Sequence, residues 1–563
     1  MKAISVVWLC VLSGGWGATE ERASRVVSTA QGPVRGYRRP HTNYYVFYSI
    51  PYATAPTGKH KFREPLAAPT WEATFEAIEE YVVCPQTGIY LQSIKTLIDY
   101  EVREECLIAN VYVPDKNDTK LSVLVYVHGG GYQIGFGNMV THRALLEMGN
   151  VIVVNFNYRL GAHGFLCLGT DDAPGNAGMK DQVALLRWVK HNIAAFGGNP
   201  DDISLIGGSA GAASVELLSL SKVASGLFNK IIPESGSGVA FWSMQSKPLE
   251  VAKAFARSKG FEDDENIFSL EEFYKNLPSD QLHDDNFMFR RDNTMGFVPC
   301  IERNGSSNPF LTEAPVNIIA GSNFEKLPVL TGFTNMENIA MLNMLEMKKT
   351  DMNENFSDFL PDDLHFANED ERHDVADEIK KFYFGKKGVD EETALGYVNY
   401  MSDTMFAYPA YRSLSLRAAA GSTSIYFYVY ALAESASVPD YPDIIGAGHC
   451  AQSMAMTDII WANLNDTDIS EDYKQLKNLL ADLWHNFVLT GNPTPVGSLA
   501  ASVLGEWTAT SPAQPRHALF NASSELRGEL WPERMALWDR VYSKYYWTPT
   551  PPPEPTKTSK NEL

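Results

Sequence analysis

The chain has 563 residues, more than a single domain usually has, and 45% of them are hydrophobic and 12% aromatic, so a large buried core can form. It carries 68 Asp and Glu against 47 Lys and Arg, which gives a net charge of −21 with no basic cluster. Nucleic acids and anionic membrane surfaces need a concentrated positive face, so the composition argues against both as partners.

The first 17 residues have the pattern of a secretory signal peptide. Lys2 precedes a largely apolar run, and Gly15 and Gly17 lie where signal peptidase requires small residues. The run is too short to cross a membrane, and no later stretch has the roughly 18 consecutive apolar residues of a spanning helix. We therefore expect a mature chain that starts at residue 18, has no membrane span and enters the oxidising lumen of the secretory pathway.

The cysteines and sequons fit such a compartment. Cys10 would leave with the signal peptide, and five cysteines remain, so at least one thiol stays free. Cys84 and Cys106 enclose a short loop and are the preferred disulfide pair, whereas the pattern leaves open the pairing of Cys167, Cys300 and Cys450. N-glycosylation sequons, some of which can arise by chance, occur at Asn117, Asn304, Asn355, Asn465 and Asn521.

The first half of the chain alternates strands with helices. Residues 122–127 and 151–158 are β-branched apolar runs, typical of strands buried on both faces of a parallel sheet. Residues 181–196 carry apolar side chains at helical spacing, and a short strand follows at 203–207, before a further helical segment. This order predicts an α/β fold with a doubly wound or related sheet.

Later segments extend the same architecture. Residues 327–333 and 425–432 are predicted strands, and helical, acidic segments such as 271–289 are interpreted as insertions on the core. The Pro-rich residues 548–563 lack a hydrophobic pattern, so we expect an extended, disordered end there. Residues 18–547 are accordingly predicted to form one domain.

Residues 207–211, Gly-Gly-Ser-Ala-Gly, fit the G-x-S-x-G pattern directly after a predicted strand and before a predicted helix. In that context Ser209 would lie in a strained turn with its hydroxyl exposed, and its small neighbours would allow close backbone approach. Glycine-rich turns around serine are also common structural elements. The pattern alone therefore leaves a structural and a catalytic interpretation open.

A serine that attacks a carbonyl needs N–H donors for the oxyanion that forms. The sequence Val-His-Gly-Gly-Gly-Tyr at residues 127–132 follows a predicted strand and is similar to the His-Gly-Gly-Gly loop of esterases and lipases. We expect the amides of Gly130 and Gly131, with that of Ala210 after the serine, to form an oxyanion hole. The alternative is a tight turn without a catalytic role.

A general base and an orienting acid are expected after the serine, in the order acid then histidine. Glu337 lies just past the strand predicted at 327–333, where such a carboxylate would be placed, although on its own it would be read as a solvated loop charge. His449 lies in a glycine-flanked loop beyond the next strand. Single histidines usually serve surface or packing roles, but this position and order favour His449 among the twelve.

Characteristic stretches recur along the chain, namely IPYATAPTGKHKFREP, EECLIANVYVP, HGGGY, GNAGMKDQVALLRWVKHNIAAFGGNPDDISLIGGSAGAAS, TGFTNMEN, GAGHC and NFVLTGNPTP. Together they resemble successive landmarks of the type-B carboxylesterase and cholinesterase family, over about Val26 to Trp538 and most of all in insect, lepidopteran carboxylesterases. The resemblance implies an α/β-hydrolase fold, with a large, mostly parallel central β-sheet flanked by helices and helical insertions over the active site.

The same resemblance implies a serine carboxylesterase that hydrolyses small carboxylic esters to acid and alcohol without a metal or other cofactor. It implies Ser209 as the nucleophile, His449 as the general base and acid, and Glu337 as the carboxylate that fixes the imidazole. It further implies Cys84–Cys106 as the first disulfide of the family. Ser235, in IPESGS, matches a serine that supports the triad from outside, although the residues alone indicate only a turn.

Three positions depart from the commonest pattern of the family. Gly208 stands where cholinesterases and many carboxylesterases carry Glu before the nucleophile, Asn338 follows the acid where Gly is usual, and Gln452 replaces an acidic residue after the histidine. None of these changes removes a triad atom. Gly208 and Gln452 do remove negative charge near the imidazolium, so the pKa of the histidine and the rate are expected to differ from those of a typical member.

The sequence also narrows the substrate class. Cholinesterases that resemble this chain bind a quaternary ammonium over a tryptophan in the loop closed by the first disulfide, and residues 85–105 contain no tryptophan. Together with Gly208, this argues against choline esters. Juvenile hormone esterases also resemble the chain but usually have Gln before the serine, which argues against that specialised activity.

A non-catalytic alternative stays open, because some relatives on this fold are binding or adhesion proteins that have lost the triad. They keep the sheet and the disulfide while the serine or histidine is replaced, whereas all three triad candidates are present here. The final residues Lys-Asn-Glu-Leu resemble a retrieval signal, which would bind a retrieval receptor and hold the protein in the endoplasmic reticulum lumen. The alternative is a chance terminus on a secreted protein.

Overall fold

The computed structural model describes residues 23–555, except for residues 117, 264–265, 289–294, 434–437 and 460–468. The predicted signal peptide, the C-terminal tetrapeptide and the sequon residues Asn117 and Asn465 lie outside these ranges. Of the other sequon asparagines, Asn304 and Asn355 are exposed and Asn521 is half-buried, so their glycosylation stays a prediction.

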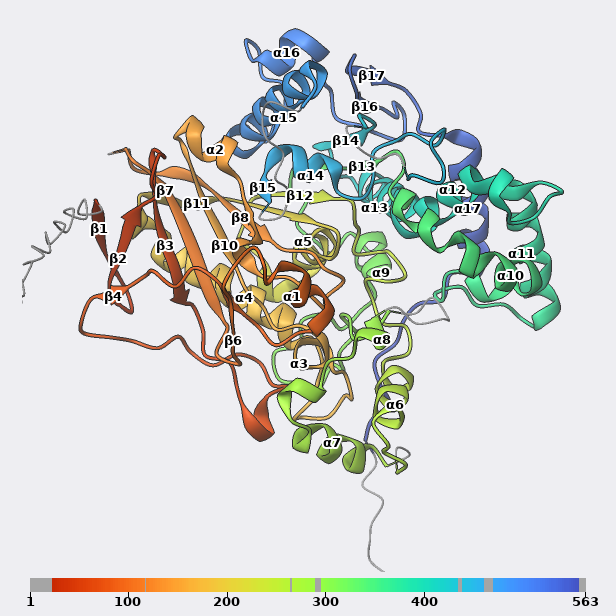
Figure 1. Ribbon diagram of the computed structural model, residues 1–563, viewed down its shortest axis with the longest axis horizontal. Helices are drawn as coiled ribbons and strands as arrows, with labels where there is room; N and C mark the ends of the chain where they lie inside the picture. The colour runs from red at the N-terminus through yellow and green to blue at the C-terminus, as the bar shows by residue number, and fades with distance from the viewer. Residues whose placement is uncertain are drawn as a thin grey trace, which may run out of the picture.

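One large sheet runs through the molecule (Figure 1), and it has 13 strands among the described residues. Its main path runs in the order β1 (Ser24–Thr29), β2 (Gly32–Arg38), β3 (Tyr44–Pro51), β7 (Ile108–Pro114), β10 (Val151–Phe156), β8 (Leu121–Val127), β11 (Gly198–Gly208), β12 (Lys230–Glu234), β13 (Val329–Thr334), β14 (Ile425–Tyr430), β16 (His517–Phe520) and β17 (Glu525–Arg527). β4 (Phe75–Glu76) pairs with β2 beside this path.

The centre of the sheet is parallel and its edges are antiparallel. Each pair from β10 to β16 is parallel, whereas β1, β2, β3, β7 and β10 pair antiparallel in succession, as do β16 and β17. The predicted α/β class and the mostly parallel centre are therefore confirmed. Two further pairs stand apart, β5 (Val82–Val83) with β6 (Glu101–Val102) and β9 (Val140–Thr141) with β15 (Asp458–Ile459).

The central strands are buried on both faces, as their apolar sequences predicted. Every residue of β8 is buried, and Val123 and Val125 belong to one hydrophobic core while Leu124 and Tyr126 belong to another. Successive side chains of a strand point to opposite faces. The two cores are therefore the layers on either side of the sheet.

Helices cover both of these faces. α4 (Ala177–Asn192) and α5 (Ala210–Leu220) pack in the first core, and α2 (Arg143–Met148) and α15 (Glu471–Thr490) pack in the second. The helix predicted at 181–196 corresponds to α4 and the 3-10 turn Ile193–Phe196 that continues it. The other helices outside the two main insertions are α1 (Gly88–Ile94), α3 (Gly161–Phe165), α14 (Ala451–Met456), α16 (Leu499–Leu504) and α17 (Pro532–Tyr545).

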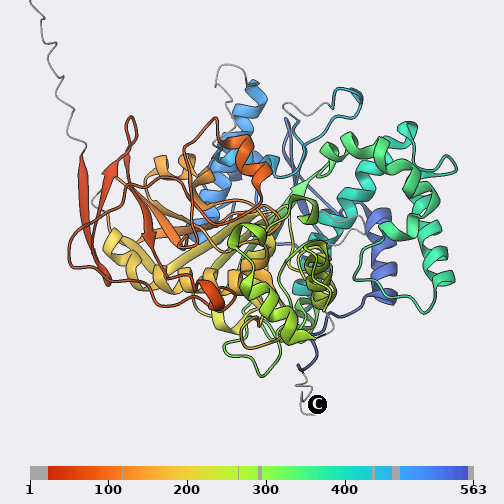
Figure 2. The same cartoon turned by 60° about the horizontal axis from the view of Figure 1, so that its bottom comes forward.

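Two helical insertions interrupt the sheet. The first, between β12 and β13, holds α6 (Pro248–Ser258), α7 (Ile267–Asn276), α8 (Asp285–Met288) and α9 (Pro315–Ala320), and the second, between β13 and β14, holds α10 (Leu345–Glu354), α11 (Glu369–Phe384), α12 (Ala394–Ser402) and α13 (Tyr408–Ala419). In Figure 1, α10, α11 and α12 gather with α17 at the right, far from β1 to β3, and Figure 2 shows the same separation after a turn of 60°.

The cysteines form two disulfides, Cys84–Cys106 and Cys167–Cys300, and Cys450 is the free cysteine among the described residues. The predicted first disulfide and the predicted free thiol are thus confirmed, while the second disulfide is a finding of the structure. Gly175 has a φ of +107°, and a Cβ there would lie 2.5 Å from the Sγ atom of Cys300. The second disulfide therefore requires a glycine beside it.

The start of the Pro-rich tail contacts the rest of the protein. Pro552 is buried, and its Cβ would lie 2.9 Å from a Cβ placed on Gly169, whose φ is +70°. Glu554 forms an ion pair with Arg303 (3.2 Å). Pro552 and Glu554 therefore contact the rest of the protein, whereas residues 556–563 lie outside the described ranges, so a disordered end stays a prediction.

Candidate active site

Ser209 lies at the sharp turn between β11 and α5. Its backbone has φ 59° and ψ −125°, a strained combination for a residue with a side chain, and its amide donates to the carbonyl of Glu234 (2.9 Å). The flanking glycines are needed, because a Cβ on Gly207 would lie 2.5 Å from the backbone of Gly211, and one on Gly211 would lie 2.1 Å from the carbonyl oxygen of Val127. The turn predicted from the sequence is present, and Ser209 is partly exposed in it.

The glycine loop that follows β8 passes directly beside this serine. A Cβ on Gly129 would lie 3.1 Å from the Cβ of Ser209. Gly130 and Gly131 have φ values of +105° and +60°, and within the described residues their amides donate to no acceptor. Ala210 is the first residue of α5, where an amide has no intrahelical acceptor. The three predicted oxyanion donors therefore come from two segments that meet at Ser209.

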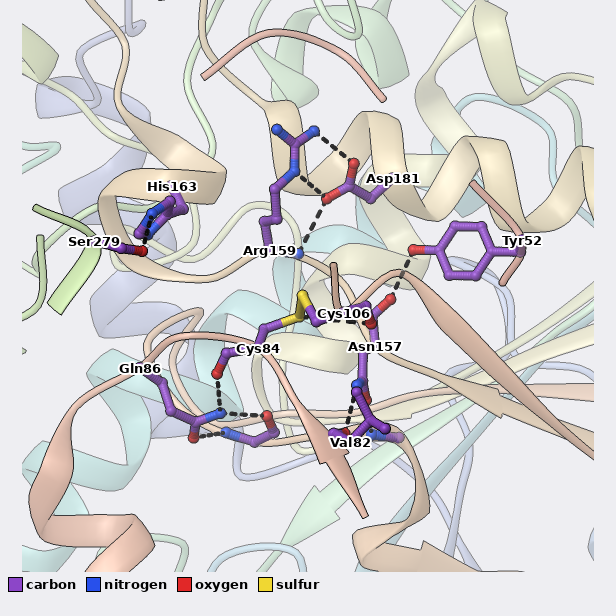
Figure 3. Close-up of a disulfide and its surroundings, with 12 residues drawn as sticks. Tyr52, Val82, Cys84, Gln86, Cys106, Asn157, Arg159, His163, Asp181 and Ser279 are labelled. Carbon is purple, nitrogen blue, oxygen red and sulfur yellow. Dashed lines mark hydrogen bonds and ion pairs between the residues drawn. A yellow bond between two sulfur atoms is a disulfide. The ribbon is translucent and has the colours of Figure 1, made fainter. Parts of the chain in front are cut away.

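Gln86 connects the first disulfide to the end of this glycine loop (Figure 3). Its side-chain amide donates to the carbonyls of Cys84 (3.1 Å) and Gly135 (2.9 Å), and its side-chain oxygen accepts from the amide of Gly135 (2.9 Å). Gln86 is buried, so these bonds replace those it would make to water. The segment after Cys84 thus holds the end of the loop at Gly135, a role that was not predicted from the sequence.

A buried ion pair supports the neighbouring segments, as Figure 3 also shows. The guanidinium of Arg159 donates to both carboxylate oxygens of Asp181 on α4 (2.6 and 2.8 Å), and their side chains are 3% and 0% exposed. The same guanidinium donates to the carbonyls of Lys61 and Arg63 (3.0 and 2.8 Å). The pair therefore joins the chain that follows β10 to α4 and to the N-terminal region.

Glu337 and His449 meet although 112 residues separate them. The Nδ1 atom of His449 lies 2.5 Å from Oε2 of Glu337, and the other carboxylate oxygen accepts from the amide of Thr334 (2.8 Å). The Glu337 side chain is fully buried, whereas that of His449 is 34% exposed. The carboxylate thus holds the imidazole through Nδ1 and leaves Nε2 as the nitrogen available for proton transfer.

Asn338, directly after Glu337, forms hydrogen bonds with the end of α12 in the second insertion. Its side chain donates to the carbonyl of Met401 (2.8 Å), and its amide donates to the Oγ atom of Ser402 (3.0 Å), both at the end of α12. The π-helical turn that follows, Asp403–Ala407, places the ring of Phe406 4.5 Å from that of His449. The second insertion therefore contacts the site, and Asn338, unlike the usual glycine, has a structural role there.

The Nε2 side of the imidazole faces Cys450. Its Sγ atom lies 3.6 Å from Nε2 of His449, and no hydrogen bond joins Ser209 and His449 among the described residues. Burial acts to lower the pKa of His449, but the neighbouring Cys450 and Glu337 more than offset this and hold that pKa well above its usual value. The contact of Cys450 with the imidazole was not predicted from the sequence.

Ser235 and Glu234 lie beneath the serine turn. The side chain of Gln452 donates to Oγ of Ser235 (2.7 Å), and both residues are fully buried. The carboxyl group of Glu234 accepts from Oγ of Ser453 (2.6 Å) and from the indole of Trp484 (2.9 Å), and burial raises its pKa to about 7. The bonds of Gln452 and Ser453 thus connect α14, which begins two residues after His449, to the strand end beneath the serine turn, and the bond of Trp484 connects α15 to it. The contribution of Glu234 was not predicted from the sequence.

The arrangement contains the parts required for acyl transfer through a covalent intermediate. They are a partly exposed serine in a strained turn, free amides beside it and a buried carboxylate paired with an imidazole. Over the described ranges, no three His, Cys, Asp or Glu side chains are arranged to hold a metal ion, and no helix is long and apolar enough to cross a membrane.

The chain is similar to known carboxylesterases. The carboxylesterase family matches residues 23–538. Esterase FE4 of Myzus persicae is 31% identical over 80% of this chain and 81% of that protein. The structure of a juvenile hormone esterase from Manduca sexta, with OTFP covalently attached, has a TM-score of 0.78 and 28% identity, over 92% of this chain and 100% of that one. Neuroligin-2 of Homo sapiens is 28% identical over 85% of this chain and 62% of that protein.

The family match covers nearly all of the described residues, and the resemblance to insect carboxylesterases expected from the sequence is confirmed. The chain therefore belongs to the carboxylesterase family and is a carboxylic-ester hydrolase with the α/β-hydrolase fold.

Proposed function

We propose that the protein hydrolyses carboxylic esters in two steps through an acyl-enzyme on Ser209. The observation that carries this proposal is the position of Ser209 in a strained, partly exposed turn beside the free amides of Gly130 and Gly131. Those amides and that of Ala210 bind the oxyanion that forms when Oγ attacks the ester carbonyl.

The Nε2 atom of His449 takes the proton of Ser209 during the attack and gives it to the leaving alcohol. Water then attacks the acyl-enzyme by the reverse sequence and releases the acid. Glu337 fixes the imidazole through Nδ1 and stabilises its charged form, and Ser235 with Gln452 supports the turn from below. The covalent attachment of OTFP to the related esterase supports a covalent nucleophile on this fold.

The Ser209→Ala variant tests the assignment. Removal of a nucleophile from such a triad lowers kcat by about 10⁴-fold or more, so hydrolysis of p-nitrophenyl butyrate is expected to fall to that extent while the circular dichroism spectrum stays unchanged. Ser219→Ala is the matched control, because Ser219 lies near the other end of the same helix, where its Oγ donates to the carbonyl of Glu216 (2.6 Å). Full turnover by the Ser209→Ala variant would refute the assignment.

The absence of a side chain at Gly208, directly before Ser209, bears on which esters the protein hydrolyses. A Cβ there would lie 3.4 Å from Sγ of Cys450 and 3.6 Å from Oγ of Ser453, with no other atom within 4 Å. No carboxylate is therefore supplied at this position, and residues 85–105 supply no tryptophan for a quaternary ammonium. We expect hydrolysis of neutral esters and little turnover of choline esters, which a panel of esters of graded acyl length and a choline ester would check.

The similarity to neuroligin-2 leaves a non-catalytic binding protein only as a distant second candidate. That candidate predicts that no ester is turned over and that no covalent adduct forms at Ser209. The presence of Ser209, Glu337 and His449, with the last two joined at 2.5 Å, favours the enzyme.

For the cellular location, we propose entry into the secretory pathway through residues 1–17 and retrieval to the endoplasmic reticulum through Lys560–Leu563, the alternative being secretion. Fluorescence microscopy of the full chain with and without the last four residues is the test. Retention that depends on these residues supports retrieval, and equal secretion of both forms contradicts it.

A further inference from the structure

Cys450 occupies a position that is special in both sequence and conformation. It directly follows His449 and caps the start of α14, with φ 58° and ψ 22° in the left-handed region. The other described cysteines are joined in disulfides, so Cys450 carries the free thiol of the described chain. A non-glycine residue in this conformation is uncommon.

The thiol is part of a three-membered chain of side chains. Sγ of Cys450 lies 3.6 Å from Nε2 of His449, whose Nδ1 lies 2.5 Å from the buried carboxylate of Glu337. An imidazole beside a thiol promotes formation of the thiolate, which is the nucleophilic form of cysteine. His449 therefore supplies an acceptor for the thiol proton, and Glu337 supplies a carboxylate that stabilises the resulting imidazolium.

The thiol also lies on the side of the imidazole that a substrate has to reach. The His449 side chain is 34% exposed and Cys450 is half-buried. Gly208, the residue before the proposed nucleophile, presents no side chain to Sγ, although a Cβ there would lie 3.4 Å away. A small electrophile that reaches Ser209 and Nε2 therefore also reaches Cys450.

We propose that Cys450 is a modification site for small thiol-directed electrophiles, and that its modification stops ester hydrolysis by occupying the Nε2 side of His449. The inference rests on the proposed role of His449. With an alkyl halide such as iodoacetamide, Sγ attacks the carbon that bears iodine, the S–C bond forms as the C–I bond breaks, iodide leaves, and the thiol proton passes to Nε2. The bulky thioether then lies between the imidazole and the serine turn.

The first experiment follows alkylation and hydrolysis together in the purified protein. General-base proton transfer contributes about 10²–10⁴-fold to a rate, and the proposed modification blocks it completely, so we expect iodoacetamide to reduce p-nitrophenyl butyrate hydrolysis by about 10³–10⁴-fold. Mass spectrometry of the Cys450 peptide should show the adduct accumulating with the same time course.

The variants Cys450→Ser and Cys450→Gly are the matched controls. Serine retains a hydrogen-bonding group without a reactive thiol, and glycine tolerates the positive φ, so the fold is preserved in at least one of them. Each is compared with its own untreated rate, and both are expected to keep that rate under iodoacetamide. Equal inactivation of these variants, or a fully alkylated wild-type protein that retains its rate, would overturn the proposal.

A second experiment does not depend on hydrolysis and so separates this inference from the proposed function. The rate of Cys450 alkylation is measured in the wild type and in His449→Gln, where the thiol has lost its imidazole. We expect labelling to be slower by about tenfold in the variant, because Sγ has lost the proton acceptor that lies 3.6 Å away in the wild type. Equal rates, or a native wild-type protein in which Cys450 becomes labelled only after denaturation, would contradict the thiol–imidazole pair.

Discussion

Glu234 provides a quantitative test of how the serine turn is held. Its carboxyl group is buried beside Ser453 and Trp484, and burial raises its pKa from 4.5 to about 7. The folded state therefore binds the carboxyl proton of Glu234 more tightly than the unfolded state does. The resulting contribution to the free energy of unfolding is fully present below pH 4.5 and is lost as the pH rises through about 7. At about 1.4 kcal/mol per pKa unit, the loss amounts to about 3 kcal/mol.

Equilibrium unfolding in urea, followed by tryptophan fluorescence at pH 5 and pH 8, measures this effect. The Glu234→Gln variant keeps the size and polarity of the side chain but does not titrate. We expect the free energy of unfolding of the wild type to fall between the two pH values by about 2–3 kcal/mol more than that of the variant. The exposed residue Glu105 offers a control, since Glu105→Gln should behave as the wild type does. An equal pH dependence of the wild type and Glu234→Gln would refute the reasoning.

Three further predictions follow from the contacts of the site and its surroundings. Glu337→Gln removes the charge that fixes His449, so kcat for p-nitrophenyl butyrate should fall about 10³–10⁴-fold; an unchanged kcat would show that the carboxylate has no such role. Asp181→Asn leaves a buried guanidinium unpaired and should cost about 3–5 kcal/mol in urea unfolding, and a cost near zero would contradict this. Replacing Cys167 and Cys300 by alanine should cost about 2–5 kcal/mol, measured in the same way, with an unchanged midpoint as the contrary result.

The parts of the site that the sequence predicted depend on local backbone geometry. Gly207 and Gly211 are required because any Cβ would collide with neighbouring backbone, and Gly129 is required because it passes next to Ser209. Such close approaches leave glycines at fixed positions, which is why the turn and the loop could be recognised. The strands predicted at 327–333 and 425–432 likewise placed Glu337 and His449 each after a strand, and the structure shows that these strands, β13 and β14, are parallel neighbours.

The parts that the sequence did not predict depend on packing between distant segments. Trp484 reaches Glu234 across 250 positions of sequence, and Cys167 pairs with Cys300 across 133. Nothing near either residue indicates such a partner. The contact of Cys450 with Nε2 was missed for another reason, since it depends on the positive φ of Cys450 rather than on residue spacing.

Labelling of the folded protein with a fluorophosphonate probe tests the central claim most directly. The probe phosphonylates a serine only when that serine is activated by a base and an oxyanion hole. Peptide mapping by mass spectrometry is predicted to find the adduct on Ser209, and none on the Ser209→Ala variant. A folded protein without an adduct on Ser209, or one labelled equally in that variant, would contradict the account.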